Sequence, residues 1–257
     1  MTRVLAHRGA SAVRPENTLE AFVEARRLGA DGVELDVRRT ADGALAVHHD
    51  AAIAGGAAVC ELDVGQLPPS VPLLDAALDA CEGMVVNVEV KNLPTDPDFD
   101  PACGVATEVA VCLIERGDEA RRYLVSSFHL ATIDAVRSVE PSLATGWLTI
   151  SGYDQLRAAD TAAEHGHAAL HPHESVVNPE LVARAHDLGL ALNTWTVDDP
   201  DRARTLGIPV RRVEVIVWTV AGLLSTLGFL LRAPFAGVAP TELAGPQVLL
   251  PALAAAV

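Results

Sequence analysis

The chain has 257 residues, of which 50% are hydrophobic and 21% are charged, and this length suffices for one large α/β domain or two small ones. Its 19 Lys and Arg residues face 34 Asp and Glu residues, a formal net charge of −15. So acidic a protein repels phosphate backbones, which argues against nucleic acid as a partner. A small anionic substrate therefore needs a local cluster of cations or a metal.

The cysteines and the N-terminus both indicate a cytoplasmic protein. The four cysteines show neither a Cys-x-x-Cys pair nor metal-type spacing, so we expect reduced and mostly packed thiols; they are Cys60, Cys81, Cys103 and Cys112. The N-terminal run Met-Thr-Arg-Val-Leu-Ala-His-Arg-Gly lacks the basic and then apolar segments of a secretory signal.

Short β-like runs alternate with amphipathic runs as far as about residue 206. The β-like runs predict strands at 3–7, 32–38, 44–49, 85–91, 123–128, 144–149, 168–171 and 190–197. The amphipathic runs predict helices at 18–28, 73–80, 104–116, 130–138, 153–163 and 179–188. Asn17 and Asn178 are the expected N-caps of the first and last of these helices.

Repeated alternation of strand and helix is typical of a parallel sheet, and at this length a TIM (β/α)8 barrel is the expected α/β architecture. A doubly wound open sheet is the alternative, but no Gly-x-Gly-x-x-Gly motif follows the first strand. We therefore expect a barrel domain over residues 1–206.

Two predicted strands carry an apolar face and an ionic face, because side chains alternate along a strand. Valine and leucine side chains lie opposite Glu34 and Asp36 in one strand, and valines lie opposite Glu89 and Lys91 in the other. In a barrel the apolar faces suit the helix layer and the ionic faces point inward. Unpaired burial of such charges is costly, so they should meet each other or a cation.

Glu34, Asp36 and Glu89 would form a site of hard oxygen ligands, suited to Mg²⁺ or Ca²⁺ rather than Zn²⁺. The alternative is an internal ion-pair network around Lys91. One lysine, however, cannot neutralise three acids, which favours the metal site.

Two histidines end predicted strands, and histidine is the side chain best suited to exchange protons near neutral pH. His7 is followed by Arg8, and His49 is followed by Asp50, which either orients His49 or caps the next turn. His48 alternates to the opposite face and is the weaker candidate. His7 and His49 are therefore the candidate acid and base.

Short motifs follow one another in a fixed order: His7-Arg8-Gly9-Ala10, Pro15-Glu16-Asn17-Thr18, Glu34-Leu35-Asp36-Val37, Asp42-Gly43, His49-Asp50, Asn87-Val88-Glu89-Val90-Lys91, Ser126-Ser127-Phe128 and Trp195-Thr196-Val197. This ordered set resembles the glycerophosphodiester phosphodiesterases over roughly residues 3–206.

The resemblance implies a TIM-barrel hydrolase that cleaves glycerophosphodiesters to an alcohol and sn-glycerol 3-phosphate with a divalent metal. Matching positions imply a metal site, an acid/base pair and two phosphate-binding cations; these are Glu34, Asp36 and Glu89, then His7 and His49, then Arg8 and Lys91. The strand faces pointed to the same acids, lysine and histidines independently of the family.

Several residues near the expected site have two readings. Glu16 is expected to touch the substrate site, whereas Asn17 is expected to be a helix cap. Phe128 and Trp195 either wall the glycerol side of the pocket or belong to the core. The remaining strand-end histidines, His129, His171 and His173, either line the mouth of the site or are structural, and the family motifs do not single them out. No function is assigned to His165, His167 and His186.

The C-terminal segment breaks the family pattern. Residues 207–257 carry three Arg and two Glu, a net of +1, and the usual closing strand is missing after the helix expected from residue 198. Residues 215–231 are seventeen residues without a charge, at the lower limit for a membrane-spanning helix. The segment also resembles a short piece of a bacterial sugar-transporter permease.

Three interpretations of residues 207–257 remain open: a fusion or frameshift remnant, a variant closing βα unit, or a membrane segment within 213–232. An incomplete barrel also leaves a second hypothesis for the whole chain, a catalytically silent or binding-only barrel. Within the enzymes, the alternative is a phospholipase acting on intact phospholipid.

Overall fold

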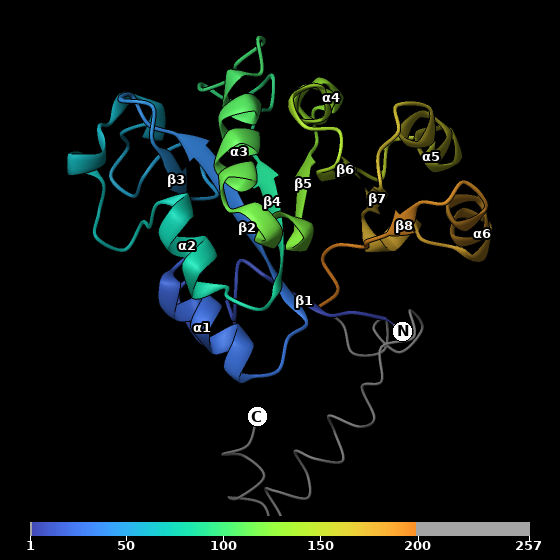
Figure 1. The fold of residues 1–257 in the computed structure, drawn as a ribbon, viewed down its shortest axis with the longest axis horizontal. Coiled ribbons are helices and arrows are strands. Elements are labelled where there is room, and N and C mark those ends of the chain that lie inside the picture. Colours follow the sequence, from blue (N-terminus) through green and yellow to red (C-terminus); the bar gives the residue numbers. More distant parts are fainter. Residues whose placement is uncertain (1, 199–257) are drawn as a thin grey trace, which may run out of the picture. The chain divides into compact units, whose positions relative to one another are not determined.

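The computed structural model describes residues 2–198 (Figure 1). An eight-stranded sheet runs in the order β1-β2-β4-β5-β6-β7-β8, and β3 pairs with β2 off this path. The strands are β1 Leu5–His7, β2 Gly32–Arg39, β3 Leu45–Val47, β4 Val85–Val90, β5 Tyr123–Ser127, β6 Ala144–Thr149, β7 Ala169–Pro172 and β8 Ala191–Leu192. All neighbours along the main path are parallel.

Helices follow the strands and lie around the outside of the curled sheet (Figure 1). They are α1 Leu19–Arg27, α2 Leu74–Ala80, α3 Gly104–Glu115, α4 Leu130–Val139, α5 Gln155–Glu164 and α6 Pro179–Asp187. Asn178 caps α6 as predicted, since its side chain accepts a hydrogen bond from the Leu181 amide. The predicted α/β class and TIM-barrel architecture are confirmed.

Strand β3 departs from the parallel alternation. It lies antiparallel to β2, with Val37 opposite Val47 and Arg39 opposite Leu45. Only residues 40–44 join the two strands, and a connection this short makes a hairpin, because a parallel partner needs a crossover of a dozen or more residues. The run at 44–49 therefore forms a strand, but this strand is not one of the parallel strands of the barrel.

The sheet path ends at β1 and β8, and no strand within residues 2–198 joins these two ends. Within the described residues the sheet is thus a curled barrel without a strand between β1 and β8. The 206/207 boundary, the apolar segment 213–232 and the rest of 207–257 lie outside the described residues. No helix within residues 2–198 is long and apolar enough to cross a membrane.

Strands β2 and β4 each have an apolar face and an ionic face, as predicted. Val33, Leu35 and Val37 are fully buried in the larger core, together with side chains of α1, α2 and α3. A second, smaller core joins β7 to α5 and α6. Full burial of one Val or Leu stabilises the fold by about 1.5–3 kcal/mol, so the helix layer is held mainly by these apolar faces while the ionic faces point inward.

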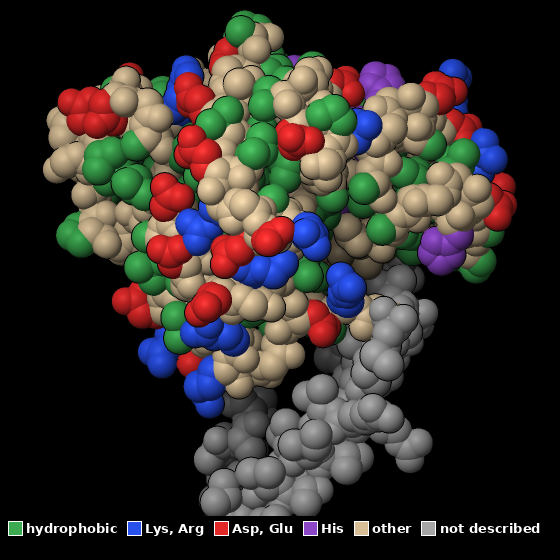
Figure 2. Space-filling view, in the orientation of Figure 1, with side chains coloured by type: hydrophobic (Ala, Val, Ile, Leu, Met, Phe, Trp, Pro, Cys, Tyr) green, Lys and Arg blue, Asp and Glu red, His purple; other side chains and the backbone are tan. Residues whose placement is uncertain are grey.

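The outer surface of the first three helices is strongly charged. Figure 2 shows acidic and basic side chains interspersed over α1, α2 and α3. Arg27 pairs with Glu24 on α1, and Arg116 pairs with Asp79 across α3 and α2. Such exposed pairs contribute little to stability, but they keep this face solvated.

Gly9 in the turn after β1 packs directly on α1, which makes Gly9→Ala a test of this contact. Its φ is +79°, and an added Cβ would lie 2.8 Å from the backbone carbon of Ala21. Left-handed strain of about 1–2 kcal/mol and overlap of about 1–3 kcal/mol should together lower the free energy of unfolding. Urea unfolding of the full chain measures this loss.

Gly29→Ala is the matched control, because Gly29 has φ +85° and nothing within 4 Å of an added Cβ. It should lose only the strain of about 1–2 kcal/mol. Equal losses for the two variants would contradict tight packing of the Gly9 turn on α1.

Candidate active site

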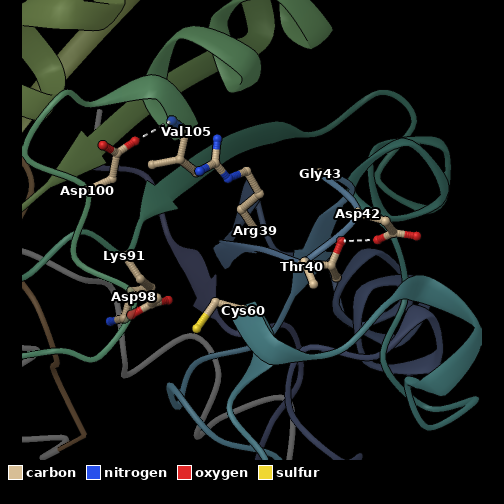
Figure 3. A pocket seen from close by; sticks show the side chains of 10 residues that line it. Arg39, Thr40, Asp42, Gly43, Cys60, Lys91, Asp98, Asp100 and Val105 are labelled. Carbon is tan, nitrogen blue, oxygen red and sulfur yellow. Dashed lines mark hydrogen bonds between the residues drawn. The ribbon is translucent and has the colours of Figure 1, made fainter.

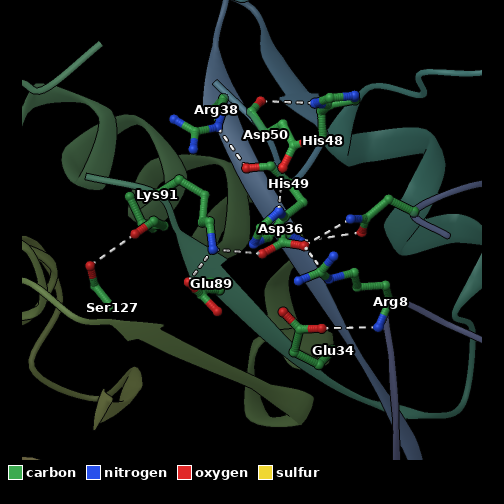
Figure 4. Close-up of polar contacts among 12 residues, drawn as sticks. Arg8, Glu34, Asp36, Arg38, His48, His49, Asp50, Glu89, Lys91 and Ser127 are labelled. Atoms are coloured by element: carbon green, nitrogen blue, oxygen red, sulfur yellow. Dashed lines mark hydrogen bonds and ion pairs between the residues drawn. The ribbon is translucent and has the colours of Figure 1, made fainter. Parts of the chain in front are cut away.

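Three carboxylates and one lysine converge on the inner face of the sheet, from β2 and from the end of β4 (Figure 4). The register places Asp36 opposite Glu89, and Glu34 lies two residues earlier on the same face of β2. Oxygen atoms of the three acids all lie within 4.8 Å of one another. Glu34, Asp36, Glu89 and Lys91 are each at most 8% exposed. The structure therefore brings together the four residues of the two predicted ionic faces.

Lys91 neutralises part of this negative charge. Its Nζ lies 2.7 Å from Glu89 Oε1 and 3.2 Å from Asp36 Oδ1. Burial opposes the charged form of Lys91, but the two carboxylates outweigh burial and raise its pKa. Lys91 is therefore a fixed cation.

The remaining negative charge is not balanced within the cluster. Burial, reinforced by Asp36 and Glu89, raises the pKa of Glu34 well above its usual value. Burial likewise raises the pKa of Glu89 to about 7. Glu34 Oε1 is buried without a hydrogen-bond partner, and Asp36 Oδ1 has only its ion pair with Lys91 among the described residues. A divalent cation fits this donor set, because it would bind Glu34 Oε1 and favour the ionised acids.

Arg8 lies beside the acids at the end of β1. Its backbone N–H donates to Glu34 Oε2 at 3.0 Å, and its Nε lies 3.4 Å from Asp36 Oδ2. Its Nη1 donates to Glu16 Oε1 at 2.9 Å. Glu16 itself is exposed, so it contacts the site through Arg8 at the rim.

The interpretation of Asn17 as a helix cap is wrong. Thr18 caps α1 by accepting a hydrogen bond from the Ala21 amide. Asn17 has φ +56° and is 4% exposed. This backbone conformation turns its side chain into the site, where Nδ2 donates to Asp36 Oδ2 at 2.8 Å.

Asn17 also accepts a hydrogen bond from the Asp36 amide at 3.3 Å. Burial raises the pKa of Asp36, but Lys91 and then Asn17 outweigh it, so the pKa is lowered overall. Asn17 is thus a site residue that the sequence missed. Its signal was the adjacent Thr18, which already supplies a good cap.

The two candidate histidines have different surroundings. His7 Nε2 lies 3.9 Å from Glu34 Oε2, and burial, followed by the Arg8 charge, lowers the pKa of His7. His49 Nδ1 lies 2.7 Å from Asp50 Oδ1, and the His49 carbonyl accepts from Arg38 Nε at 2.9 Å. Asp50 therefore orients the His49 ring.

His48 is bound elsewhere, with its Nδ1 2.9 Å from the Asp50 carbonyl. Its own amide donates to the Asp36 carbonyl at 3.0 Å. These contacts hold the segment after β3 against β2. They support His48 as a structural residue rather than a proton carrier.

An aromatic pair occupies the carboxyl ends of β5 and β8. Phe128 and Trp195 are half-buried and meet edge to face with ring centroids 5.4 Å apart. His173 contacts the other side of Trp195 at 5.0 Å. The partial exposure of both rings differs from the fully buried residues of the core, and it leaves both able to contact a ligand.

The remaining strand-end histidines have protein partners. His129 Nδ1 lies 3.1 Å from Thr132 Oγ1 at the start of α4. His171 is buried inside the barrel, where burial lowers its pKa to about 4 and Asn193 Nδ2 lies 2.9 Å from its Nε2. These contacts agree with the structural reading of both residues.

A cavity of about 400 Å³ lies beyond the end of β2, and Lys91 is the only proposed site residue among those that line it (Figure 3). Its walls come from the β2–β3 turn, Cys60 and the loop around Asp98 and Asp100. Arg38 holds this loop through ion pairs to Asp96 and Asp98 at 2.8 and 2.7 Å. The cavity is therefore separate from the carboxylates and the two candidate histidines.

Known proteins are similar to this chain in both sequence and fold. A glycerophosphodiester phosphodiesterase of Caldanaerobacter subterraneus is 33% identical over 77% of this chain and 86% of its own length. One from Bacillus altitudinis is 29% identical over 79% of this chain and 97% of its own.

The solved structure of glycerophosphodiester phosphodiesterase from Thermotoga maritima superposes with a TM-score of 0.66. It is 25% identical and matches 81% of this chain and 91% of its own. Residues 7–213 match the model of the glycerophosphoryl diester phosphodiesterase family. The predicted enzyme class, a hydrolase of phosphoric diesters, is thereby confirmed, and the chain belongs to the glycerophosphoryl diester phosphodiesterase family.

Proposed function

We propose that the protein hydrolyses glycerophosphodiesters to an alcohol and sn-glycerol 3-phosphate, with a divalent cation and two histidines. The observation that carries the proposal is the cluster of three buried carboxylates around one lysine, in which Glu34 Oε1 has no hydrogen-bond partner. Membership of the family supports the substrate class. The half-buried His7 and His49 supply groups that exchange protons near neutral pH.

Glu34, Asp36 and Glu89 would hold the cation, and Mg²⁺ or Ca²⁺ suits their hard oxygens. Bound there, it supplies positive charge to the phosphate oxygens as negative charge develops in the transition state. Asn17 keeps Asp36 oriented through its two hydrogen bonds. Asn17 therefore acts as a positioning residue.

Arg8 and Lys91 are proposed to bind the phosphodiester. Both cations lie against the carboxylate cluster, with Arg8 beside Asp36 and Lys91 between Asp36 and Glu89. Their charges offset part of the negative charge of the three carboxylates, where an anionic substrate would approach.

His7 is proposed as the base, since burial and Arg8 lower its pKa and keep it neutral at pH 7. It would take the proton of the attacking hydroxyl, from water or from a neighbouring hydroxyl of the substrate. His49, oriented by Asp50, would donate a proton to the leaving alcohol. This division follows the rule that acid and base start in opposite protonation states.

Phe128 and Trp195 are proposed to wall the glycerol side of the pocket, and Glu16 to position Arg8 at the rim. The edge-to-face pair presents a half-buried apolar surface, which suits the carbon skeleton of glycerol. The charged side chains of Arg8 and Lys91 suit the phosphate.

The expected setting is the cytoplasm, with a small-molecule substrate and no nucleic acid. All four cysteines are unpaired, as is typical of a reducing compartment.

The second candidate is a silent or binding-only barrel. Catalytic groups need fixed positions, and within the described residues no strand joins β1 to β8. Both candidates retain the same site residues, so a measurement of phosphodiesterase activity distinguishes the enzyme from the silent barrel.

Release of glycerol 3-phosphate from glycerophosphoethanolamine by the purified chain is the first test. Turnover should appear with Mg²⁺ or Ca²⁺ and disappear with excess chelator, because one lysine cannot neutralise the three acids of the site. A coupled assay of glycerol 3-phosphate measures it. A folded chain without turnover under any metal would favour the silent barrel, and turnover that persists in chelator would overturn the metal requirement.

Asp36→Asn should lower kcat/KM by more than about 100-fold, because it removes one proposed cation ligand and the ion-pair partner of Lys91 and Arg8. It should also raise the metal concentration needed for half-maximal rate. Asp118→Asn is the matched control, since Asp118 is 95% exposed on the outer surface and should leave the kinetics unchanged. A normal metal requirement in Asp36→Asn would contradict the assignment.

The pH profile of kcat/KM should be bell-shaped. A base with a lowered pKa is neutral above that pKa, so the rate should rise with pH in the range below about 6.5. His7→Gln should remove this rise, whereas His186→Gln on the surface of α6 should keep it. A flat wild-type profile between about pH 5 and 9 would contradict the two-histidine scheme.

A further inference from the structure

Asp134, His165 and His167 form a second group of metal-type ligands, remote from the catalytic residues. Asp134 lies in α4, His165 ends α5, and His167 precedes β7. The catalytic groups lie at the carboxyl ends of the strands, whereas these residues lie at the opposite, amino-terminal end. We propose that Asp134, His165 and His167 bind Zn²⁺, with water as the fourth ligand.

The three ligand atoms already have spacing suited to one small cation. His165 Nδ1 lies 2.9 Å from Asp134 Oδ1, and His167 Nε2 lies 3.3 Å from the same oxygen. All three atoms lie within 4.8 Å of one another. Tetrahedral zinc with ligand distances of about 2.0–2.1 Å separates its ligand atoms by about 3.3 Å. Small side-chain rotations would therefore complete the site.

The state of His167 is the second, independent observation. Its side chain is 0% exposed, and Nε2 has no hydrogen-bond partner although a carboxylate oxygen lies 3.3 Å away. Its other nitrogen, Nδ1, lies 2.9 Å from Thr145 Oγ1. An imidazole that donates from Nδ1 to this hydroxyl aims the lone pair of Nε2 at the carboxylate, and a cation between them removes the repulsion.

Burial, with Arg137 and His165 adding to it, lowers the pKa of His167 to about 4. The ring is therefore neutral at pH 7, which is the form that binds metals. Arg137 packs against Gly166, where an added Cβ would lie 2.9 Å from its Nη2. Arg137 thus opposes the metal by its charge but also keeps His167 ready to bind.

The donor set favours zinc over the hard cations of the catalytic site. Two imidazole nitrogens and one carboxylate suit Zn²⁺, whereas Mg²⁺ and Ca²⁺ prefer oxygen ligands. Asp134 and His165 have side chains 37% and 40% exposed. An ion can therefore enter from solvent, and water can complete its coordination.

A metal here would join parts of the fold that pack separately. Helix α4 contributes Val136 to the larger core, whereas α5 contributes Ala158, Ala159 and Ala162 to the smaller one. Gly166, with φ +75°, makes the turn that places the two histidines on the same side. A ligand that binds only the folded state stabilises it, so zinc should raise the melting temperature.

The test is a titration of the full chain with Zn²⁺, in Mg²⁺ excess to occupy the catalytic carboxylates, followed by calorimetry and thermal melting. Wild type should bind one equivalent and melt at a higher temperature. Co²⁺ in place of Zn²⁺ should give the visible absorption of a four-coordinate site.

His165→Ala should weaken zinc binding by at least about 10- to 100-fold and abolish the thermal shift. His165 is exposed, so this variant should fold and keep its phosphodiesterase rate. His186→Ala, another exposed histidine, should bind zinc as wild type does. Asp36→Asn should keep the Co²⁺ absorption, which assigns the signal to the site outside the catalytic cluster.

Two results would overturn the proposal. One is wild-type zinc affinity in His165→Ala. The other is no zinc equivalent in folded wild type in Mg²⁺, which would make the three residues an ion-pair network only.

Discussion

The register between β2 and β4 is the constraint on which the site depends. It sets Asp36 beside Glu89 and points Glu34, Asp36, Glu89 and Lys91 into the same buried space. A slip of one residue would turn these charges toward the helices and the valines inward. The apolar outer faces prevent that slip, because it would expose the larger core. The same strand register therefore fixes both the packing of the core and the placement of the charges.

Burial and charge oppose each other throughout this cluster. Lys91 holds Asp36 ionised, with help from the Asn17 side chain, whereas Glu34 and Glu89 are driven toward protonation. A protein that left the cluster in this state would keep buried acids at a cost in stability. A divalent cation would offset that cost, which is why these residues are proposed to bind a metal.

The two ends of the barrel differ in chemistry because they differ in ligand type. The carboxyl ends of β2 and β4 collect carboxylates, and the amino-terminal end near β6 and β7 collects imidazoles around Asp134. Hard oxygen donors and nitrogen donors select different cations. The two proposed cation sites would therefore differ in the metal that they prefer.

The sequence by itself determined the strands, the helices, the ionic faces and the family, since these follow from local periodicity and ordered motifs. Tertiary structure alone decided that β3 is antiparallel, that Asn17 turns into the site, and that Asp134 meets two histidines about thirty residues away. The direction of β3 depends on the length of its connection to β2. The position of the Asn17 side chain depends on the sign of one φ angle, and the Asp134 group depends on the packing of distant segments. Alternation along a strand carries no information about any of them.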